Sequence, residues 1–239
     1  AFKTTQQALR LAEKLNDIKS QGSSTASLAV IYEMLDDYPN AEKYYRKAIE
    51  LFHKIEGENR NLGITHYNLS ILLEKKKRYS ESQQQLQQAY KHAIASGDLG
   101  LAAACKIGEG TLSVMQKRLD EARDLLAEGI RLADESGEIF TQAEGQLAWA
   151  NLLFKQNQSK EARQFAFQAY ATYTEIQDID GQMRSTQLLS RCDSTLGDFR
   201  NALSRYQEYI QYRDSIKNED NALEIGRLEA RYEARKERE

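Results

Sequence analysis

The sequence contains very little proline and cysteine. Its 239 residues include one proline, Pro39, and two cysteines, Cys105 and Cys192. So few helix-breaking residues, among many Ala, Leu, Glu, Gln, Lys and Arg, favour helices. Two cysteines are too few for a disulfide framework, and we expect both to be free, half-buried thiols. Free thiols favour a reducing compartment.

The chain also lacks a strong excess of charge and a long apolar run. Its formal net charge is −3, whereas nucleic-acid-binding domains are usually basic with a clustered patch, so we expect no nucleic-acid partner. No stretch approaches the ~20 apolar residues of a membrane-spanning helix, and no signal peptide is recognisable. The sequence starts with Ala1 rather than Met and in the middle of a repeat. We therefore expect a piece of a longer protein, about whose targeting these absences say little.

Motifs for catalysis and for metal binding are missing as well. There is no Gly-Lys-Ser/Thr phosphate loop and no Gly-x-Ser-x-Gly elbow. The Gly-Glu-Gly sequence at 108–110 lies inside a predicted helix and lacks the strand that a dinucleotide loop follows. The histidines His53, His66 and His92 do not share the spacing of a two-histidine helical metal site. We predict a protein that is not an enzyme, with no catalytic residue, cofactor or metal.

What the chain does contain is an internal repeat. A small residue recurs at intervals of 40 or 41 residues, usually with an aromatic or aliphatic residue four positions later and another small residue seven later. Offsets of four and seven lie on one face of a helix, where a small residue lets a second helix approach closely. These anchor residues are Ala1, Ala41, Ser82, Ala122, Ala162 and Ala202.

A second small residue lies twelve positions before each of the last five anchors and belongs to an earlier helix. These residues are Ala29, Ser70, Gly110, Ala150 and Ser190. Turns are predicted between the two helices, at residues 36–38, 77–79, 117–119, 157–159 and 197–199. Each unit is thus a first helix, a tight turn and a second helix. We expect Gly57, Gly97 and Gly137 to end second helices in the left-handed conformation.

Two positions of the first helices depart from the repeat. Glu109 stands where a leucine is usual, and Asp193 stands where a tyrosine or leucine is usual. Two interpretations are open. Either the first helix rotates or frays in those units, or the carboxylates form a polar spot in the wall of a groove.

The repeat resembles that of the tetratricopeptide-repeat family. The residues that carry the resemblance in the second unit are Leu28-Ala29, Tyr32, Asp37-Tyr38, Ala41, Tyr45 and Ala48. It covers nearly the whole chain, although the usual period is 34 residues and the proline that usually ends the second helix is absent. The resemblance implies an all-α fold, a right-handed superhelical solenoid of antiparallel helix pairs over residues 1–217. A charged extra helix is expected at 218–239, giving about eleven to twelve helices.

The last residues, 206–239, resemble the end of the tetratricopeptide sensor region of bacterial signalling proteins. Such proteins include histidine kinases, LuxR-like regulators and diguanylate cyclases. The matching residues are Tyr209, Arg213-Asp214-Ser215, Asn218-Glu219, Ile225, Leu228-Glu229 and Arg231-Tyr232-Glu233. The resemblance implies a membrane helix or coiled coil after Glu239 and a periplasmic location. The free thiols favour the cytoplasm instead, so the location stays open.

The final helix is expected to begin at Asn218, a suitable N-cap. Ile225, Leu228 and Tyr232 form an apolar seam in it. In a parallel dimer this seam would place like charges opposite one another. Dimerisation therefore stays open, and the alternative is an end cap that packs on the last repeat.

The family resemblance also implies that the first helices line a concave face. The binding residues expected there are Tyr67, Ile71, Thr111, Met115, Asn151, Phe154, Arg184 and Arg191. Ile64, Ile107 and Leu147 either join them or pack between helices. A wall that is apolar at its centre and basic at its C-terminal end suits an extended peptide or an amphipathic helix with an acidic end.

We therefore interpret the chain as a protein- or peptide-binding module, the sensory or regulatory region of a larger bacterial signal-transduction protein. The alternative is a stand-alone scaffold or adaptor without an output domain.

Overall fold

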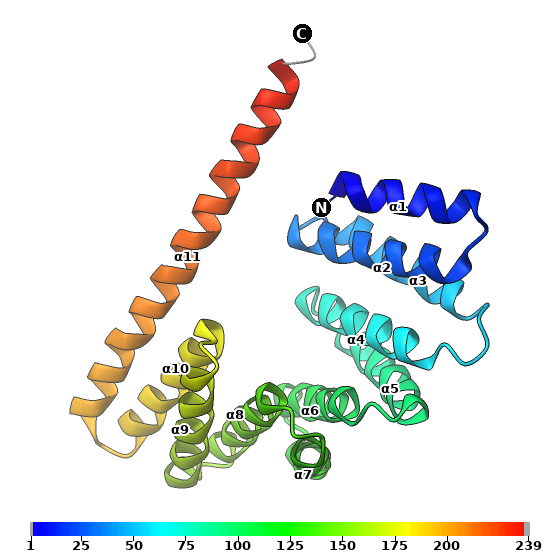
Figure 1. Cartoon of the computed structure of the whole chain (residues 1–239). Helices are drawn as coiled ribbons and strands as arrows, with labels where there is room; N and C mark the ends of the chain where they lie inside the picture. Colours follow the sequence, from blue (N-terminus) through cyan, green and yellow to red (C-terminus); the bar gives the residue numbers. More distant parts are fainter. Residues whose placement is uncertain (1, 237–239) are drawn as a thin grey trace. The chain divides into compact units, whose positions relative to one another are not determined.

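The computed structural model of the chain describes the backbone of residues 2–236 and the side chains of residues 2–217. Within that range every regular element is a helix (Figure 1), which confirms the all-α prediction. The eleven helices are α1 Phe2–Lys14, α2 Ile18–Met34, α3 Tyr38–Phe52, α4 Asn59–Lys75, α5 Tyr79–Ser96, α6 Leu99–Met115, α7 Leu119–Ser136, α8 Ile139–Lys155, α9 Ser159–Glu175, α10 Ile179–Thr195 and α11 Phe199–Lys236.

The helices pack as the repeat predicts. The first helix of a pair contacts its second helix in α2–α3, α4–α5, α6–α7 and α10–α11, and consecutive pairs meet through α3–α4, α5–α6 and α9–α10. The chain divides into two compact units, Ala1–Thr141 and Gln142–Glu239. We call them unit 1 and unit 2 and describe each by itself.

The turn inside each helix pair is closed by one residue in the left-handed conformation. These residues are Asp36, Lys77, Lys117, Asn157 and Gly197, with φ between 55° and 80°. In each turn the next backbone N–H reaches the carbonyl five residues earlier, as Arg78 does to Leu73 at 2.9 Å. This is the hydrogen bond of a Schellman cap, which satisfies carbonyls that the helix end leaves unpaired. The predicted tight turns are therefore present, although a lysine occupies the strained position twice.

The glycine caps are only partly as predicted. Gly97 and Gly137 end α5 and α7 in the left-handed conformation. Gly57 also has positive φ, at 76°, but α3 ends at Phe52, so its prediction as the cap of that helix is wrong. The reason is that Lys54 and Ile55 donate to carbonyls only three residues back. These tighter bonds end the helix before it reaches Gly57.

The anchor residues form the centre of each helix pair. Ala41, Ser82, Ala122 and Ala162 are completely buried, and so are the small residues seven positions later. Space for a side chain is smallest at Gly181 on α10. A Cβ there would lie 2.2 Å from the buried ring of Tyr173. Alanine, glycine and serine at these positions therefore set how closely the helices approach.

Glu109 and Asp193 are buried within regular helices, with exposures of 5% and 4%. The interpretation that their helices rotate or fray is therefore wrong, because both side chains occupy the core positions that the register gives them. Arg163 on α9 pairs with Asp193 at 3.1 Å. No such partner for Glu109 is present among the described side chains, and burial raises the pKa of its carboxyl.

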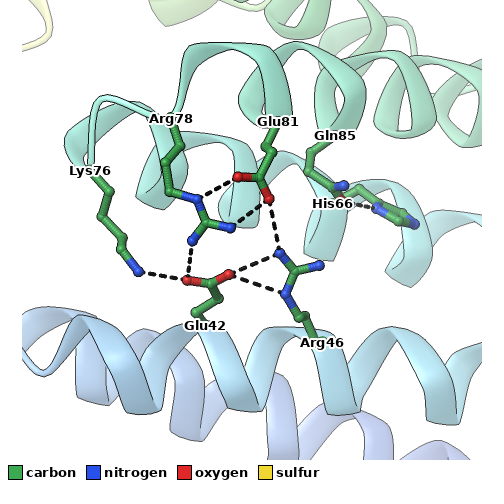
Figure 2. Close-up of polar contacts among 7 residues, drawn as sticks. All are labelled: Glu42, Arg46, His66, Lys76, Arg78, Glu81 and Gln85. Atoms are coloured by element: carbon green, nitrogen blue, oxygen red, sulfur yellow. Dashed lines mark hydrogen bonds and ion pairs between the residues drawn. The ribbon is translucent and has the colours of Figure 1, made fainter.

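An ion-pair network joins α3 to the next helix pair (Figure 2). The Glu42 carboxylate accepts hydrogen bonds from Lys76 and Arg78, both at 2.7 Å, and from Arg46 at 2.9 Å. Arg78 also binds Glu81. Burial alone would raise the pKa of Glu42, but the three cationic donors together lower it to about 2. The network thus fastens neighbouring repeats at their turn end.

Both cysteines are free, as predicted, but they are fully rather than half buried. Burial raises the pKa of the Cys192 thiol to about 11. A thiol held protonated in this way is a poor nucleophile. Both cysteine side chains are therefore part of the buried core.

The C-terminal helix does not begin at Asn218. The backbone of α11 is unbroken from Phe199 to Lys236, so the second helix of the last pair continues directly into the predicted extra helix. The seam of Ile225, Leu228 and Tyr232 lies outside the residues whose side chains the structure describes. Among the described helices, none combines the length and the hydropathy that crossing a membrane requires.

Candidate binding surface

An open cavity of about 260 Å³ lies between α2, α3 and α4 in unit 1. Its apolar wall comes from Val30 and Met34 at the end of α2 and from Ile71 on α4. Met34 is 65% exposed and Val30 is 38% exposed, so much of this wall faces solvent. The other lining residues are Glu33, Tyr45, Asn68 and Lys75.

The charged groups of this cavity neutralise one another. Glu33 accepts a hydrogen bond from the Lys75 ammonium at 2.7 Å and one from the Tyr45 hydroxyl at 3.0 Å. The hydrogen bond to Glu33 raises the pKa of Lys75, so the lysine stays charged and paired. Burial raises the pKa of Tyr45, so its hydroxyl stays a donor. The cavity therefore offers apolar surface and the Asn68 amide rather than a net charge.

Of the predicted binding residues in unit 1, Ile71 lines this cavity. Tyr67 is half-buried and packs against the core around Leu86 and Leu112. The Thr111 hydroxyl donates to its own helix, at the carbonyl of Ile107, at 2.8 Å. Met115, at the end of α6, is 50% exposed.

In unit 2 the four predicted residues are largely engaged by the protein itself. The Arg191 guanidinium lies 4.6 Å from the centre of the Phe154 ring. Arg184 binds Asp180 at 2.7 Å and also binds Glu144. The Asn151 amide donates to the carbonyl of Leu147 at 2.9 Å.

The environment of Arg184 explains why it stays ionised. Burial alone would lower the pKa of its guanidinium, but the hydrogen bonds and charge of Glu144 raise it. The Tyr173 hydroxyl donates to the same carboxylate at 2.6 Å. A ligand of Arg184 would therefore share the guanidinium with the carboxylates of Glu144 and Asp180.

Three residues were left open between groove and core. Ile107 and Leu147 are buried, at 6% and 3% exposure, and pack between helices, whereas Ile64 is 38% exposed. Conversely, the sequence predictions omitted Val30 and Met34, which the structure places beside Ile71. The available signal was an apolar residue at the end of a first helix, the same place at which Met115 was predicted.

A second open cavity, of about 320 Å³, lies in unit 2 between α9, α10 and α11. Its two arginines already have partners: Arg163 pairs with Asp193 and Arg205 pairs with Glu208. Across the part of the chain that the structure describes, no cluster of three or more His, Cys, Asp or Glu side chains is arranged to hold a metal ion.

Residues 20–95 match the family model described as tetratricopeptide repeat. No curated protein matches the chain. Among solved structures, BtubC from P. vanneervenii is 14% identical with a TM-score of 0.72, over 90% of this chain and 91% of that one.

Two further structures share the fold. The Rap conjugation gene regulator of plasmid pLS20, in complex with the Phr* peptide, is 16% identical with a TM-score of 0.72, over 86% of this chain and 57% of the regulator. PilF of Pseudomonas aeruginosa is 22% identical with a TM-score of 0.57, over 92% of this chain and 95% of that protein. At these identities the likeness concerns the fold. The tetratricopeptide-repeat model thus matches residues 20–95, and the chain has the all-α solenoid fold that its sequence predicts.

Proposed function

We propose that this chain is a binding module for a protein or peptide and that the cavity between α2 and α4 holds an apolar side chain of the partner. The observation that carries the proposal is the open apolar wall of Val30, Met34 and Ile71 beside an internally neutral Glu33–Lys75 pair. Buried apolar contacts supply most of the affinity in such surfaces. The peptide complex of the Rap regulator, which shares the fold, supports a peptide as the partner.

In unit 2 we propose Phe154 and Arg191 as a second contact. The stacked pair presents an aromatic ring and an exposed guanidinium together. Arginine and aromatic residues are frequent hot spots of interfaces, and a guanidinium would prefer a partner with an acidic residue. Thr111, Met115, Asn151, Tyr67 and Arg184 stay predictions of the sequence as direct contacts.

A peptide library displayed on phage and selected on the full chain would test the proposal. Ile71→Asp and Met34→Asp should each lower the affinity for the selected peptides by about 30-fold, the equivalent of ~2 kcal/mol. Ile94→Asp is the matched control, because Ile94 is 48% exposed on the second helix α5. Equal affinities for Ile71→Asp, Met34→Asp and the parent would refute the proposed cavity.

Arg191→Glu tests the second contact separately. It should weaken peptides that carry acidic residues and reduce the salt dependence of their binding. Neutral peptides should be affected less. If acidic and neutral peptides lose affinity equally, Arg191 does not recognise the negative charge of the peptide.

At a finer level, we propose that the module is the sensory or regulatory region of a bacterial signalling protein. The pattern of residues 206–239 motivates this. Sequencing the gene beyond the codon for Glu239 tests it. A kinase, cyclase or DNA-binding region there supports the sensor, and a stop codon supports the stand-alone adaptor.

A further inference from the structure

The three histidines of the chain, far apart in sequence, lie together in unit 1. His53 follows the last residue of α3, His66 is on α4 and His92 is on α5. Their ring centres are 6.4 Å apart for His53–His66, 6.2 Å for His53–His92 and 5.7 Å for His66–His92. The rings of His66 and His92 are nearly parallel, at 7°. Three helices thus meet at one group of imidazoles, which we call the histidine cluster.

The hydrogen bonds of the cluster fit neutral rings. The Nδ1 atom of His66 lies 2.7 Å from the Gln85 amide oxygen (Figure 2), and Nδ1 of His92 lies 2.9 Å from the Asn59 amide oxygen. An amide oxygen only accepts, so each Nδ1 carries the hydrogen and donates it. Each of these bonds is made by a ring that carries a single proton, on Nδ1. His66 is only 6% exposed, so a positive charge on it would be poorly hydrated.

The electrostatic surroundings also disfavour protonation. Burial lowers the pKa of His66 and outweighs the hydrogen bond to Gln85, which raises it, and the neighbouring His92 and His53 lower it further. Burial lowers the pKa of His92, as do His53 from the end of α3 and Lys91 on α5. The carboxylate next to Asn59, that of Glu58 at the start of α4, is paired with Lys19 at 2.9 Å. The groups whose charge acts on the two rings are His53, His92 and Lys91, and each of them is a cation when protonated.

We propose that the histidine cluster makes the packing of α3, α4 and α5 acid-sensitive, so that unit 1 loosens as the pH falls from neutrality toward about 5. Unit 2 contains no histidine and should not share this response.

The sign follows from linkage. The folded state binds protons at His66 and His92 less readily than the unfolded chain does. The stabilising effect is complete above the ordinary histidine pKa of about 6.5 and decreases as the pH falls below it. Each histidine held neutral raises the unfolding equilibrium constant by at most about tenfold per pH unit in this range. Between pH 7.5 and 5.5 each group can contribute up to about tenfold, so two such groups predict a rise of up to about a hundredfold.

Hydrogen exchange of the full chain at the two pH values, corrected for intrinsic rates, measures this rise. Peptides from α4 and α5 should lose more protection at pH 5.5 than peptides from α9 and α10, with a difference of up to about a hundredfold. Fluorescence of Trp149, the only tryptophan and a residue of unit 2, reports that unit independently. The double variant His66→Asn/His92→Asn should remove the extra loss, since Asn keeps a donor near each amide oxygen. An equal loss in both units, or one that persists in the double variant, would overturn the proposal.

If the double variant does not fold, the unsubstituted chain still decides the question. The imidazole resonances of the folded chain can be titrated by NMR. Those of His66 and His92 should titrate below pH 6.5. If both titrate at about the ordinary value, the cluster exerts no acid-sensitive effect and the proposal is wrong.

Discussion

The first helices α4 and α10 occupy the same place in the repeat, yet they offer different surfaces. On α4 in unit 1, Ile71 and Asn68 border an open cavity whose charged pair is internally neutral. On α10 in unit 2, Arg184 is held by Glu144 and Asp180, and Arg191 is stacked on Phe154. The register is common to both helices, whereas the partners of the side chains are not.

The difference shows that an equivalent position in the repeat does not by itself decide how a side chain is engaged. Apolar surface that faces water gains free energy when a partner covers it. A paired arginine gains less, because the carboxylates of Glu144 and Asp180 already neutralise its charge and occupy part of its donors. Residue type and register suggested equal roles for Ile71 and Arg184. Their surroundings separate the two roles.

The largest loss of stability is expected from substitutions of the anchor alanines, on which the helix packing of both units depends. Ala122→Leu in unit 1 and Ala162→Leu in unit 2 should each destabilise the chain by about 2–3 kcal/mol, because the anchors are completely buried and overpacking forces helices apart. The matched controls are Ala127→Leu on α7 and Ala171→Leu on α9, both exposed. They should change stability by less than about 0.5 kcal/mol. Urea midpoints that do not differ between anchors and controls would show that the register is wrong.

A smaller loss of stability is expected in unit 2 when the contacts of Glu144 are removed. Glu144→Ala removes the acceptor of both Arg184 and the buried Tyr173 hydroxyl. Because these donors lose a shared carboxylate in a half-buried site, we expect a loss of about 2 kcal/mol. Trp149 packs near Phe165 and its fluorescence during urea unfolding should show the loss in unit 2. If Glu144→Ala is neutral while Arg184→Ala reduces peptide binding, Arg184 is a binding residue rather than a structural one.

The smallest effect concerns the two buried carboxylates. Glu109→Leu should stabilise unit 1 by about 1 kcal/mol at pH 7, since it replaces a buried, raised-pKa carboxyl with the residue usual at that position. The gain should be smaller at pH 4, because below its ordinary pKa the carboxyl is neutral in both the folded and unfolded states. Asp193→Leu breaks the pair with Arg163 and should gain less. A larger gain for Asp193→Leu than for Glu109→Leu would contradict this reading of the two sites.

The fold was largely predictable, because the repeat is a pattern of small side chains at fixed offsets. Ala41, Ala122 and Ala162 can be read from spacing alone, and their burial follows from close helix packing. The turns at Lys77 and Lys117 were placed correctly, but the left-handed conformation of these two lysines was not predicted. The end of α3 was missed, because a change from α-helical to tighter hydrogen bonds depends on local geometry rather than on the nearest glycine.

The binding surface was predictable only in part. Ile71 borders the cavity as the register suggested, but Val30 and Met34 reach it from the neighbouring pair. The distances among the histidines show the same limit. His53, His66 and His92 are not three or four residues apart. The spacing of short helical motifs therefore gives no sign that their rings are close. Packing of α3, α4 and α5 nevertheless brings their rings within 6.4 Å.

The sequence by itself determined the helices, their pairing and the small residues between them, because these follow from periodicities within one or two neighbouring elements. Only the tertiary structure decided which polar groups are satisfied. Whether Arg184 is paired, whether Asp193 has a cation, and whether two histidines can be protonated all depend on side chains tens of residues away. Electrostatic free energies depend on distance and burial in three dimensions, and no local pattern in the sequence encodes either quantity.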